Sequence, residues 1–541
     1  MSLPEPDPVP ATTRLQAQFD DAVKDFIDSL DLNPAEAVDM AVEEFGTGAD
    51  LSGVDRTWPP EDRVAHPVAV AFAAVRAGLD ASIVAGCLEP AVVEGLDAVV
   101  AAVRAPGDEG ARAASVAQAE FAATHVCRLL DALVKHSAAD GASLTRVLGV
   151  IASLACSSKA LRKEIVLEGG AQRLTAALTS SPWCVAGRPG AAAAVRAAEA
   201  LAKKCEPAKV AFVEIGTPSL ADLLVTRLAA PLASSEEGGT DPFAAARSLR
   251  RHIAGALAAC ADADDRDAPG SKAFAHGMKI GKDFGGIAAL HAALAEELGA
   301  GVADGADGAA ATSGDGAVKD DVLLRSLLRC LQKISVNDDL CGAFADLGGL
   351  RLTLYALTAR GAEDASRRVA ASAAGLLGQL LGRDSNKSAL ANLGYLELVP
   401  ALAGTYAEHP EVIDPLLRVV SMVCLRLPEL AQRCWDAGCV ELACEALDQH
   451  RDNGPVCRQA CQVVRNVAVR SEELRKGCLA LAGGHLERRI RAARARHTEA
   501  RDVGGAALRD LQLEYHGVTE KDDVAAGKLD LGNLDYYYSA L

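Results

Sequence analysis

A glycine that recurs at nearly constant spacing constrains this chain more than any other feature. Each such glycine separates a short amphipathic run from a second apolar run, as in FADLGGLRLTLYAL and CWDAGCVELACEAL. The seven glycines are Gly169, Gly216, Gly285, Gly348, Gly394, Gly438 and Gly483. Four of the six intervals are 44 to 47 residues long, and the other two are 69 and 63 residues. A repeat of this length predicts a stack of similar helical units that bury their apolar faces against each other.

The order of elements within one repeat narrows the fold class. A glycine can end a short helix in the left-handed conformation at little cost, so that the next helix leaves at a steep angle. A longer helix is predicted after each second run, for example over residues 322–336 and 366–381. Three helices per repeat are typical of armadillo rather than HEAT units. The sequence therefore predicts an all-α, armadillo-type α-solenoid, a right-handed superhelix of three-helix repeats with a helical N-terminal region.

Insertions explain the two long intervals. Residues 231–242 and 261–272 lie in the first, and residues 299–320 lie in the second. All three segments are rich in Gly, Asp or Ser, so we expect them to be solvated, mobile loops. The predicted organisation is a helical N-terminal segment at 1–60, irregular helices or first repeats at 64–140, the repeat array at 141–500 and a tail at 501–541.

Composition excludes several classes of function. Half of the residues are hydrophobic but only 4% are aromatic, which favours helices packed through small side chains over β-sheets. The net charge of -18 repels phosphate backbones, so we expect no nucleic-acid partner. The opening MSLPEPDPVP is not a signal peptide, and no apolar run without charges is long enough to predict a membrane span.

The cysteines indicate the compartment. The chain has 15, an odd number, with no CxxC pair and no zinc-type spacing. Buried, reduced cysteines that act as small hydrophobic side chains are the expected form. This predicts a cytoplasmic protein, with the nucleus as a second location.

No motif predicts catalysis, a cofactor or a metal site. The stretch GMKIGKDFGG resembles a phosphate-binding loop, but Gly277 and Gly281 are one residue too close and Asp283 replaces the required Ser or Thr. The 11 histidines form no recognised catalytic signature with Ser, Cys or Asp. We therefore expect a non-enzymatic protein, a monomeric scaffold or adaptor that binds partner proteins or extended peptides in a concave groove.

Residues on the third helices define the candidate binding face. Armadillo grooves that read basic import signals carry a Trp and, four residues later, an Asn on each third helix. The helices of this chain place Gly149, Arg196, His252, Arg329, Gly375, Arg418 and Gln462 at the Trp position. They place Ser153, Ala200, Ala256, Lys333, Gln379, Met422 and Asn466 at the Asn position. With no Trp and a single Asn in these positions, a reader of basic import signals is disfavoured.

The same register predicts a row of cations. Arg196, His252, Arg329 and Arg418 would project into the groove and favour acidic or phosphorylated segments of protein partners. The alternative is that these cations lie on the helix flanks and pair with acids of neighbouring repeats, since an error of one residue turns a helix by about 100°. The full candidate set is Arg196, His252, Arg329, Lys333, Gln379, Arg418, Gln462 and Asn466. A transport or assembly adaptor for an extended peptide is the alternative function.

The N-terminal segment carries a more specific pattern. It contains an FD-x-x-V start, a P-x-E-A-V helix, a phenylalanine that ends E-E-F and a G-x-D-L-S sequence. The residues are Phe19, Asp20, Val23, Pro34, Glu36, Ala37, Val38, Phe45, Gly48, Asp50, Leu51 and Ser52. With the A-L-R-D-L at 507–511, this pattern resembles the armadillo repeat-containing protein 6 family. The resemblance implies an intracellular interaction protein and supplies no catalytic residues.

Overall fold

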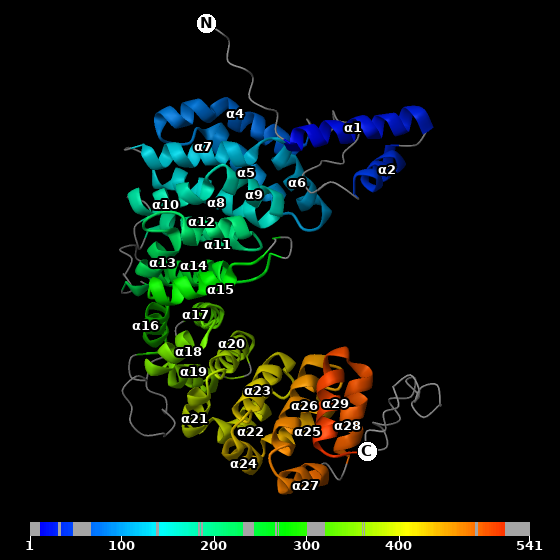
Figure 1. Cartoon of the computed structure of the whole chain (residues 1–541). Coiled ribbons are helices and arrows are strands. Elements are labelled where there is room, and N and C mark those ends of the chain that lie inside the picture. Colours follow the sequence, from blue (N-terminus) through cyan, green and yellow to red (C-terminus); the bar gives the residue numbers. More distant parts are fainter. Residues whose placement is uncertain are drawn as a thin grey trace. The chain divides into compact units, whose positions relative to one another are not determined.

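The computed structural model describes residues 11–30, 34–46, 66–136, 140–181, 184, 188–230, 243–265, 268, 270–299, 320–359, 361, 363–481 and 485–513. These residues are almost entirely helical, and their only β-type pairing is a single bridge between Gly216 and Ser219. The chain divides into two compact units, which we call the N-terminal unit (Met1–Phe284) and the C-terminal unit (Gly285–Leu541). The predicted all-α fold is confirmed (Figure 1).

Two helix pairs come first among the described residues. Helices α1 (Ala11–Leu30) and α2 (Pro34–Gly46) pack on each other through a small core of their own. Helices α4 (Pro67–Ala85) and α5 (Pro90–Val103) form the second pair. The helical N-terminal region predicted from the sequence is therefore present.

Among the described residues, eight sets of three helices follow in chain order, and the fourth set is divided between the two units. Their first helices are α6 (Asp108–Ala119), α9 (Lys159–Leu167), α12 (Glu206–Glu214), α15 (Ala273–Met278) with the π-helix η3 (Lys279–Asp283), α18 (Asp338–Asp346), α21 (Asp384–Asn392), α24 (Pro428–Asp436) and α27 (Glu472–Ala480). Their second helices are α7 (Ala122–Lys135), α10 (Gly170–Ser180), α13 (Leu220–Ala229), α16 (Gly286–Leu298), α19 (Gly349–Thr358), α22 (Tyr395–Thr405), α25 (Cys439–Gln449) and α28 (Leu486–Arg496). Their third helices are α8 (Gly141–Ser157), α11 (Pro189–Ala202), α14 (Ala244–Cys260), α17 (Asp321–Ile334), α20 (Asp364–Leu380), α23 (Pro410–Val423), α26 (Gly454–Ala468) and α29 (Thr498–Asp510).

The recurring glycines perform the predicted turn. Six of the seven lie between a first and a second helix with a positive φ, from 73° at Gly285 to 96° at Gly216. A side chain rarely adopts this conformation, so glycine is the favoured residue there. Phe121 takes the same place between α6 and α7, with φ of 56°. The glycine pattern could not reveal the repeat α6–α8 for that reason, and the structure therefore has one repeat more than the glycines mark.

Local signals also explain where the third helices begin. The side chains of Asp140, Asp320 and Asn453 accept hydrogen bonds from backbone amides in the first turns of α8, α17 and α26. Pro189 and Pro410 open α11 and α23, where the missing N–H of proline costs nothing. The prediction of 322–336 for one third helix agrees with the observed Asp321–Ile334 to within two residues.

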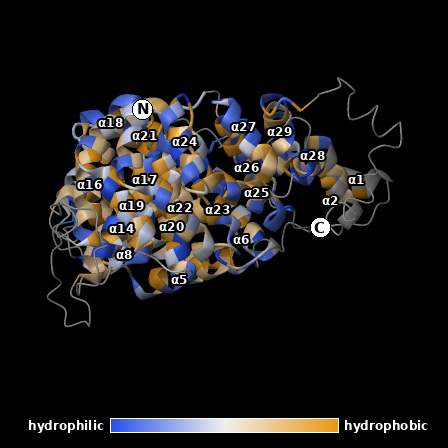
Figure 2. Ribbon diagram, turned by 90° about the horizontal axis from the view of Figure 1, so that it is seen from below, coloured by the Kyte–Doolittle hydropathy of each residue, from blue (hydrophilic) through white to orange (hydrophobic). Residues whose placement is uncertain are grey.

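Successive third helices pack directly on each other. In the N-terminal unit α8 packs on α11 and α11 on α14, and in the C-terminal unit α17, α20, α23, α26 and α29 pack in the same sequence. Small residues permit close approach, and a Cβ added at Gly255 of α14 would lie only 2.6 Å from the carboxyl carbon of Glu199 on α11. Figure 2 shows hydrophobic and hydrophilic residues on the same helices, as a packed amphipathic helix requires.

The insertion at 261–272 contains an aspartate that is not solvated, although its residues 270–272 are exposed. It was expected to be solvated, but Asp265 is buried and accepts hydrogen bonds from Lys159 and from the backbone amide of Glu206. An Asp-rich composition favours a solvated loop, but here Lys159 and the Glu206 amide compensate the Asp265 carboxylate. The insertions at 231–242 and 300–319, residues 48–52, Gly483 and the tail from 514 lie outside the described residues.

One described helix is long and apolar enough to span a membrane. Helix α4 reaches a mean hydropathy of 1.7 over 18 residues, although it contains Arg76 and Asp80. Its residues Phe72 and Val75 are buried, and α4 packs along α5. Core helices of water-soluble domains pass the same test of length and composition.

Candidate functional site

The third-helix face of the N-terminal unit presents one unpaired cation. Arg196 on α11 is exposed and has no hydrogen bond or ion pair with any described residue. His252 on α14 differs, because its Nδ1 lies 2.8 Å from a carboxylate oxygen of Glu199 on α11. Lys203 donates to the same carboxylate at 2.6 Å. His252 is therefore held by an acid of the neighbouring repeat. This is the alternative stated above, in which the cations pair with acids of neighbouring repeats.

Glu199 organises this part of the face. Burial alone would raise the pKa of Glu199, but hydrogen bonds from His252 and Lys203 lower it below the usual value. The Glu199 carboxylate is thus ionised at neutral pH and compensates the positive charge of Lys203. Gly255 leaves the space that the Glu199 side chain occupies. An acidic ligand would meet a negative charge here, next to Arg196.

The C-terminal unit presents a more open group of cations. Arg329 on α17 is exposed and has no hydrogen bond or ion pair with any described residue. Lys333, one turn further along α17, is half-buried and has an interaction partner. Gln379 on α20 is exposed and donates to the backbone carbonyl of Ser335 at 2.9 Å. Its amide therefore joins α20 to the end of α17.

Arg418 on α23 is exposed but accompanied by an acid. Its guanidinium lies 3.5 Å from Asp414, one turn away on the same helix. Burial raises the pKa of Asp414 above the usual value, while Arg418 and Arg458 act to lower it. The Arg418 side chain also lies against Gly378 of α20, where a Cβ would be 3.4 Å from its Cδ. Arg418 thus spans the contact between two third helices.

The last two candidates, Gln462 and Asn466, form hydrogen bonds with each other and within the protein. Gln462 donates to the side-chain oxygen of Asn466 at 2.8 Å. Asn466 is buried and donates in turn to the backbone carbonyl of Ser421 on α23, at 2.7 Å. The single asparagine in the predicted register is therefore used within the protein. It is not available to hold the backbone of a peptide.

The predicted row of cations is best described as two pairs, one in each unit. Arg196 and His252 lie in the N-terminal unit, and Arg329 and Arg418 lie in the C-terminal unit. None of the three arginines forms an ion pair with an acid of another repeat within the described residues. His252 does form such a contact, with Glu199.

Arg325 is a further cation, at neither the Trp position nor the Asn position of the predicted register. It lies one turn before Arg329 on α17, is half-buried and has no hydrogen bond or ion pair with any described residue. Burial lowers the pKa of Arg325, and the nearby charges of Arg329 and Arg368 lower it further, while Asp364 raises it. The spacing of four residues from Arg329 was a usable signal, because such residues share a helix face.

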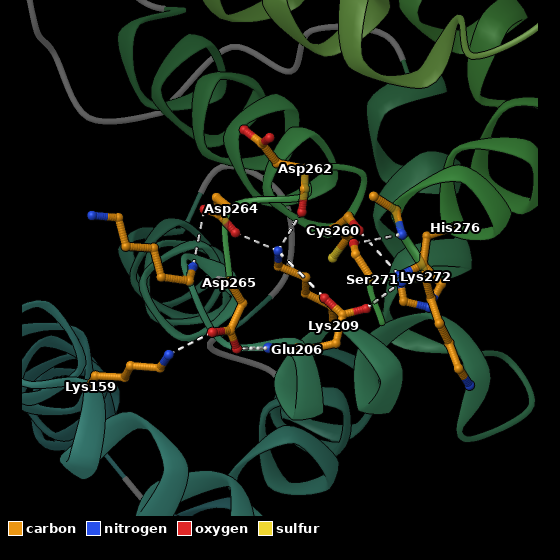
Figure 3. Close-up of polar contacts among 12 residues, drawn as sticks. Lys159, Glu206, Lys209, Cys260, Asp262, Asp264, Asp265, Ser271, Lys272 and His276 are labelled. Carbon is orange, nitrogen blue, oxygen red and sulfur yellow. Dashed lines mark hydrogen bonds and ion pairs between the residues drawn. The ribbon is translucent and has the colours of Figure 1, made fainter. Parts of the chain in front are cut away.

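A dense group of titratable residues surrounds Lys209 in the N-terminal unit (Figure 3). The Lys209 amine is fully buried and donates to the Asp262 carbonyl and to Asp264, both at 2.5 Å. Glu206 lies 3.8 Å from the same amine. A neutral lysine with access to substrate could be a nucleophile, but this amine is enclosed and paired with carboxylates. The arrangement therefore stabilises the fold.

The described residues give no support for a metal site, a reactive buried thiol or a phosphate-binding loop. No group of three or more His, Cys, Asp or Glu side chains there could hold a metal ion. All 15 cysteines are free thiols, and 13 are buried. Burial raises the pKa of Cys341 to about 11 and that of Cys127 to about 12, so little thiolate forms at these two residues at neutral pH. The stretch around Lys279 is helical, whereas a phosphate-binding loop would require a strand before its loop.

Comparison with known structures agrees with the architecture. The structure of an engineered protein superposes on 91% of this chain and 98% of its own, with 20% identity and a TM-score of 0.53. A structure from work on a phosphorylation switch in the interaction between cadherin and β-catenin superposes on 92% of this chain and 81% of its own, with 15% identity and a TM-score of 0.52. A designed armadillo repeat protein covers 54% of this chain with 15% identity and a TM-score of only 0.38.

The first two likenesses, together with the order of the helices described above, show the fold class. The chain is an armadillo-type α-solenoid, with three-helix repeats and a left-handed residue between the first and second helices. No model of a protein family matches the sequence. No curated protein matches it.

Proposed function

We propose that this protein is a non-enzymatic scaffold that binds acidic, extended segments of partner proteins on the third helices of its C-terminal unit. Arg329 carries the proposal, because it is an exposed cation without a partner among the described residues of a protein with net charge -18. Arg418 adds a second exposed guanidinium two repeats away. Arginine forks bind carboxylates with two parallel hydrogen bonds, so an acidic segment fits this face.

Asn466 and Gln379 form hydrogen bonds within the protein, which affects how a ligand could be recognised. Both side-chain amides donate to carbonyls of the preceding third helix. A ligand would therefore be recognised mainly through its charged side chains. We expect such binding to weaken as salt increases, since exposed charges are screened.

A defined peptide tests the proposal. We expect a labelled 12-residue peptide of alternating Glu and Gly to bind the full chain, and the variant Arg329→Glu with Arg418→Glu to bind it at least tenfold more weakly. Arg509→Glu on α29, also exposed, is the matched control and should bind as the wild type does. Circular dichroism checks that each variant is folded. Equal affinity of the folded double variant and the wild type would contradict the proposal.

We also propose membership of the armadillo repeat-containing protein 6 family, based on the N-terminal pattern. Phe19, Val23 and Ala37 of that pattern form the buried core between α1 and α2. Phe45 packs edge-on against Phe19, with ring centroids 6.0 Å apart. The pattern thus specifies a helix pair, and Phe19→Asp should unfold that pair selectively.

We propose the cytoplasm, with the nucleus as a second site, as the location. The free thiols support this proposal, because buried reduced cysteines are typical of reducing compartments. Microscopy of a fluorescently tagged chain tests it, and a secreted protein would contradict it.

A further inference from the structure

Two arginines without an ion pair among the described residues lie close together on α17. Arg325 and Arg329 are four residues apart on one helix face, and neither has a hydrogen bond or ion pair with any described residue. Residues at this spacing have Cβ atoms about 5–6 Å apart. Long side chains on a helix point toward its N-terminus, so the Arg329 side chain extends over the turn that carries Arg325. The two guanidinium groups can therefore reach one ligand.

Acids on the next two third helices, α20 and α23, already have arginine partners. Arg368 on α20 pairs with Asp364 at 2.9 Å, and Arg367 pairs with the same carboxylate at 2.7 Å. Arg367 also pairs with Glu411 on α23 at 2.6 Å. The pKa of Arg325 is lowered by burial, and Arg329 and Arg368 contribute to that shift. Arg325 and Arg329 thus have no ion pair within the described part of the chain, while Arg367 and Arg368 hold the carboxylates of Asp364 and Glu411.

We propose that Arg325 and Arg329 form a binding site for a phosphoserine or phosphothreonine side chain in a partner's extended segment. This inference rests on the proposed function, since it assigns one part of the same face to a modified residue. A phosphoryl group carries about -1.5 to -2 charges and three acceptor oxygens at neutral pH. It can bridge two guanidinium forks at once, whereas a single carboxylate is satisfied by one. The pair of arginines therefore selects a phosphoryl group over a glutamate.

The same arrangement predicts an unusual effect on stability. Like charges at this spacing destabilise a helix slightly, so Arg325→Gln together with Arg329→Gln should leave the thermal midpoint unchanged or higher. Two arginines that repel each other without a binding partner contribute nothing to the fold. A clearly lower midpoint would indicate that they have a structural role and would contradict the proposal.

Three labelled peptides test selectivity directly, with the full chain in fluorescence anisotropy. They share one 12-residue Glu/Gly sequence and differ only at a central Ser, Glu or phosphoserine. We expect the phosphoserine peptide to bind wild type at least tenfold more tightly than the Glu peptide. In the Arg325→Gln and Arg329→Gln double variant the three affinities should become equal, and Arg329→Lys, which keeps the charge but loses the fork, should retain part of the preference. Arg509→Gln, the matched control, should retain all of it.

The outcomes separate this inference from the proposed function. If the Glu and phosphoserine peptides bind wild type equally, or the double variant keeps the preference, the phosphoryl site is wrong while acidic binding stands. If none of the three peptides binds, the proposed function fails with it. Inorganic phosphate at millimolar concentration should compete only weakly with the phosphoserine peptide, and complete displacement would show that the site binds free phosphate.

Discussion

Two buried lysines, Lys209 in the N-terminal unit and Lys387 in the C-terminal unit, occupy the same place in their repeats. Each is the fourth residue of a first helix, α12 or α21, and each side chain is fully buried. Each amine donates to a backbone carbonyl two residues beyond the end of the third helix in its repeat, at Asp262 or Leu425. A carbonyl left without a donor at a helix end is costly when buried, so both lysines close the helix end in the same way.

The two sites differ in where the compensating acids lie. Lys209 pairs with Asp264 of the 261–272 insertion and faces Glu206, which is itself buried. Lys387 pairs at 2.8 Å with Asp384, which is about half exposed and also binds Arg426. The insertion therefore places one ammonium among carboxylates away from water, while the C-terminal unit leaves its acid in solvent. A buried charge that loses its partner costs far more than a solvated one.

The substitution Lys209→Met should have the largest effect. It leaves the buried carboxylate of Glu206 and the Asp262 carbonyl without the ammonium, at a cost of about 3–5 kcal/mol. Urea unfolding followed by circular dichroism measures the loss, and hydrogen exchange of α12 and α14 locates it. A loss below about 1 kcal/mol would remove the distinction between the two lysines.

The substitution Asp265→Asn should have the second largest effect. Asp265 binds the Lys159 amine at 2.5 Å and the Glu206 amide at 2.9 Å, so it joins α9 to α12. Asparagine keeps the bond to the amide and loses the charge, which costs about 1.5–3 kcal/mol. Faster hydrogen exchange at the start of α9 should accompany it. Asp267→Asn, in the same insertion, is a comparison at a residue outside those described. Unchanged exchange at α9 would argue against the link.

The substitution Lys387→Met should cost about 1–2 kcal/mol, less than Lys209→Met. Its main consequence is an unsatisfied Leu425 carbonyl, because Asp384 keeps both Arg426 and water as partners. Urea unfolding with hydrogen exchange of α21 and α23 provides the measurement. A cost equal to that of Lys209→Met would show that the solvated acid matters as much as the buried ones.

The smallest effect should be a pH dependence confined to the C-terminal lysine site. The hydrogen bond from Lys387 lowers the pKa of Asp384 below its usual value, and Arg426 contributes to the shift. A lowered pKa means that the contribution to stability is present above about pH 4 and is lost as pH falls through the folded-state value. The free energies of unfolding of wild type and Asp384→Asn, measured by urea unfolding, should therefore differ above about pH 4 and converge below it. The difference should shrink in a Lys387→Met background, and a difference that grew at low pH would contradict this assignment.

The sequence alone determined the repeat and its helices. The period of the glycines, the left-handed turns at Gly348 and Gly394 and the third helix at Asp321–Ile334 all follow from local preferences of the backbone and from helical periodicity. The glycine pattern did not reveal the repeat α6–α8, because Phe121 adopts the left-handed conformation in place of a glycine. The exposed Arg196 and Arg329 could likewise be placed, since an exposed helix position depends on periodicity.

Only the tertiary structure decided which side chains meet across repeats. Asn466 donates to a carbonyl 45 residues earlier, and Lys209 pairs with an aspartate 55 residues later in an insertion whose composition favours solvent. These partners depend on how each helix is rotated against the next. A rotation of one residue, about 100°, exchanges one partner for another while the hydrophobic pattern tolerates several residues on each buried face.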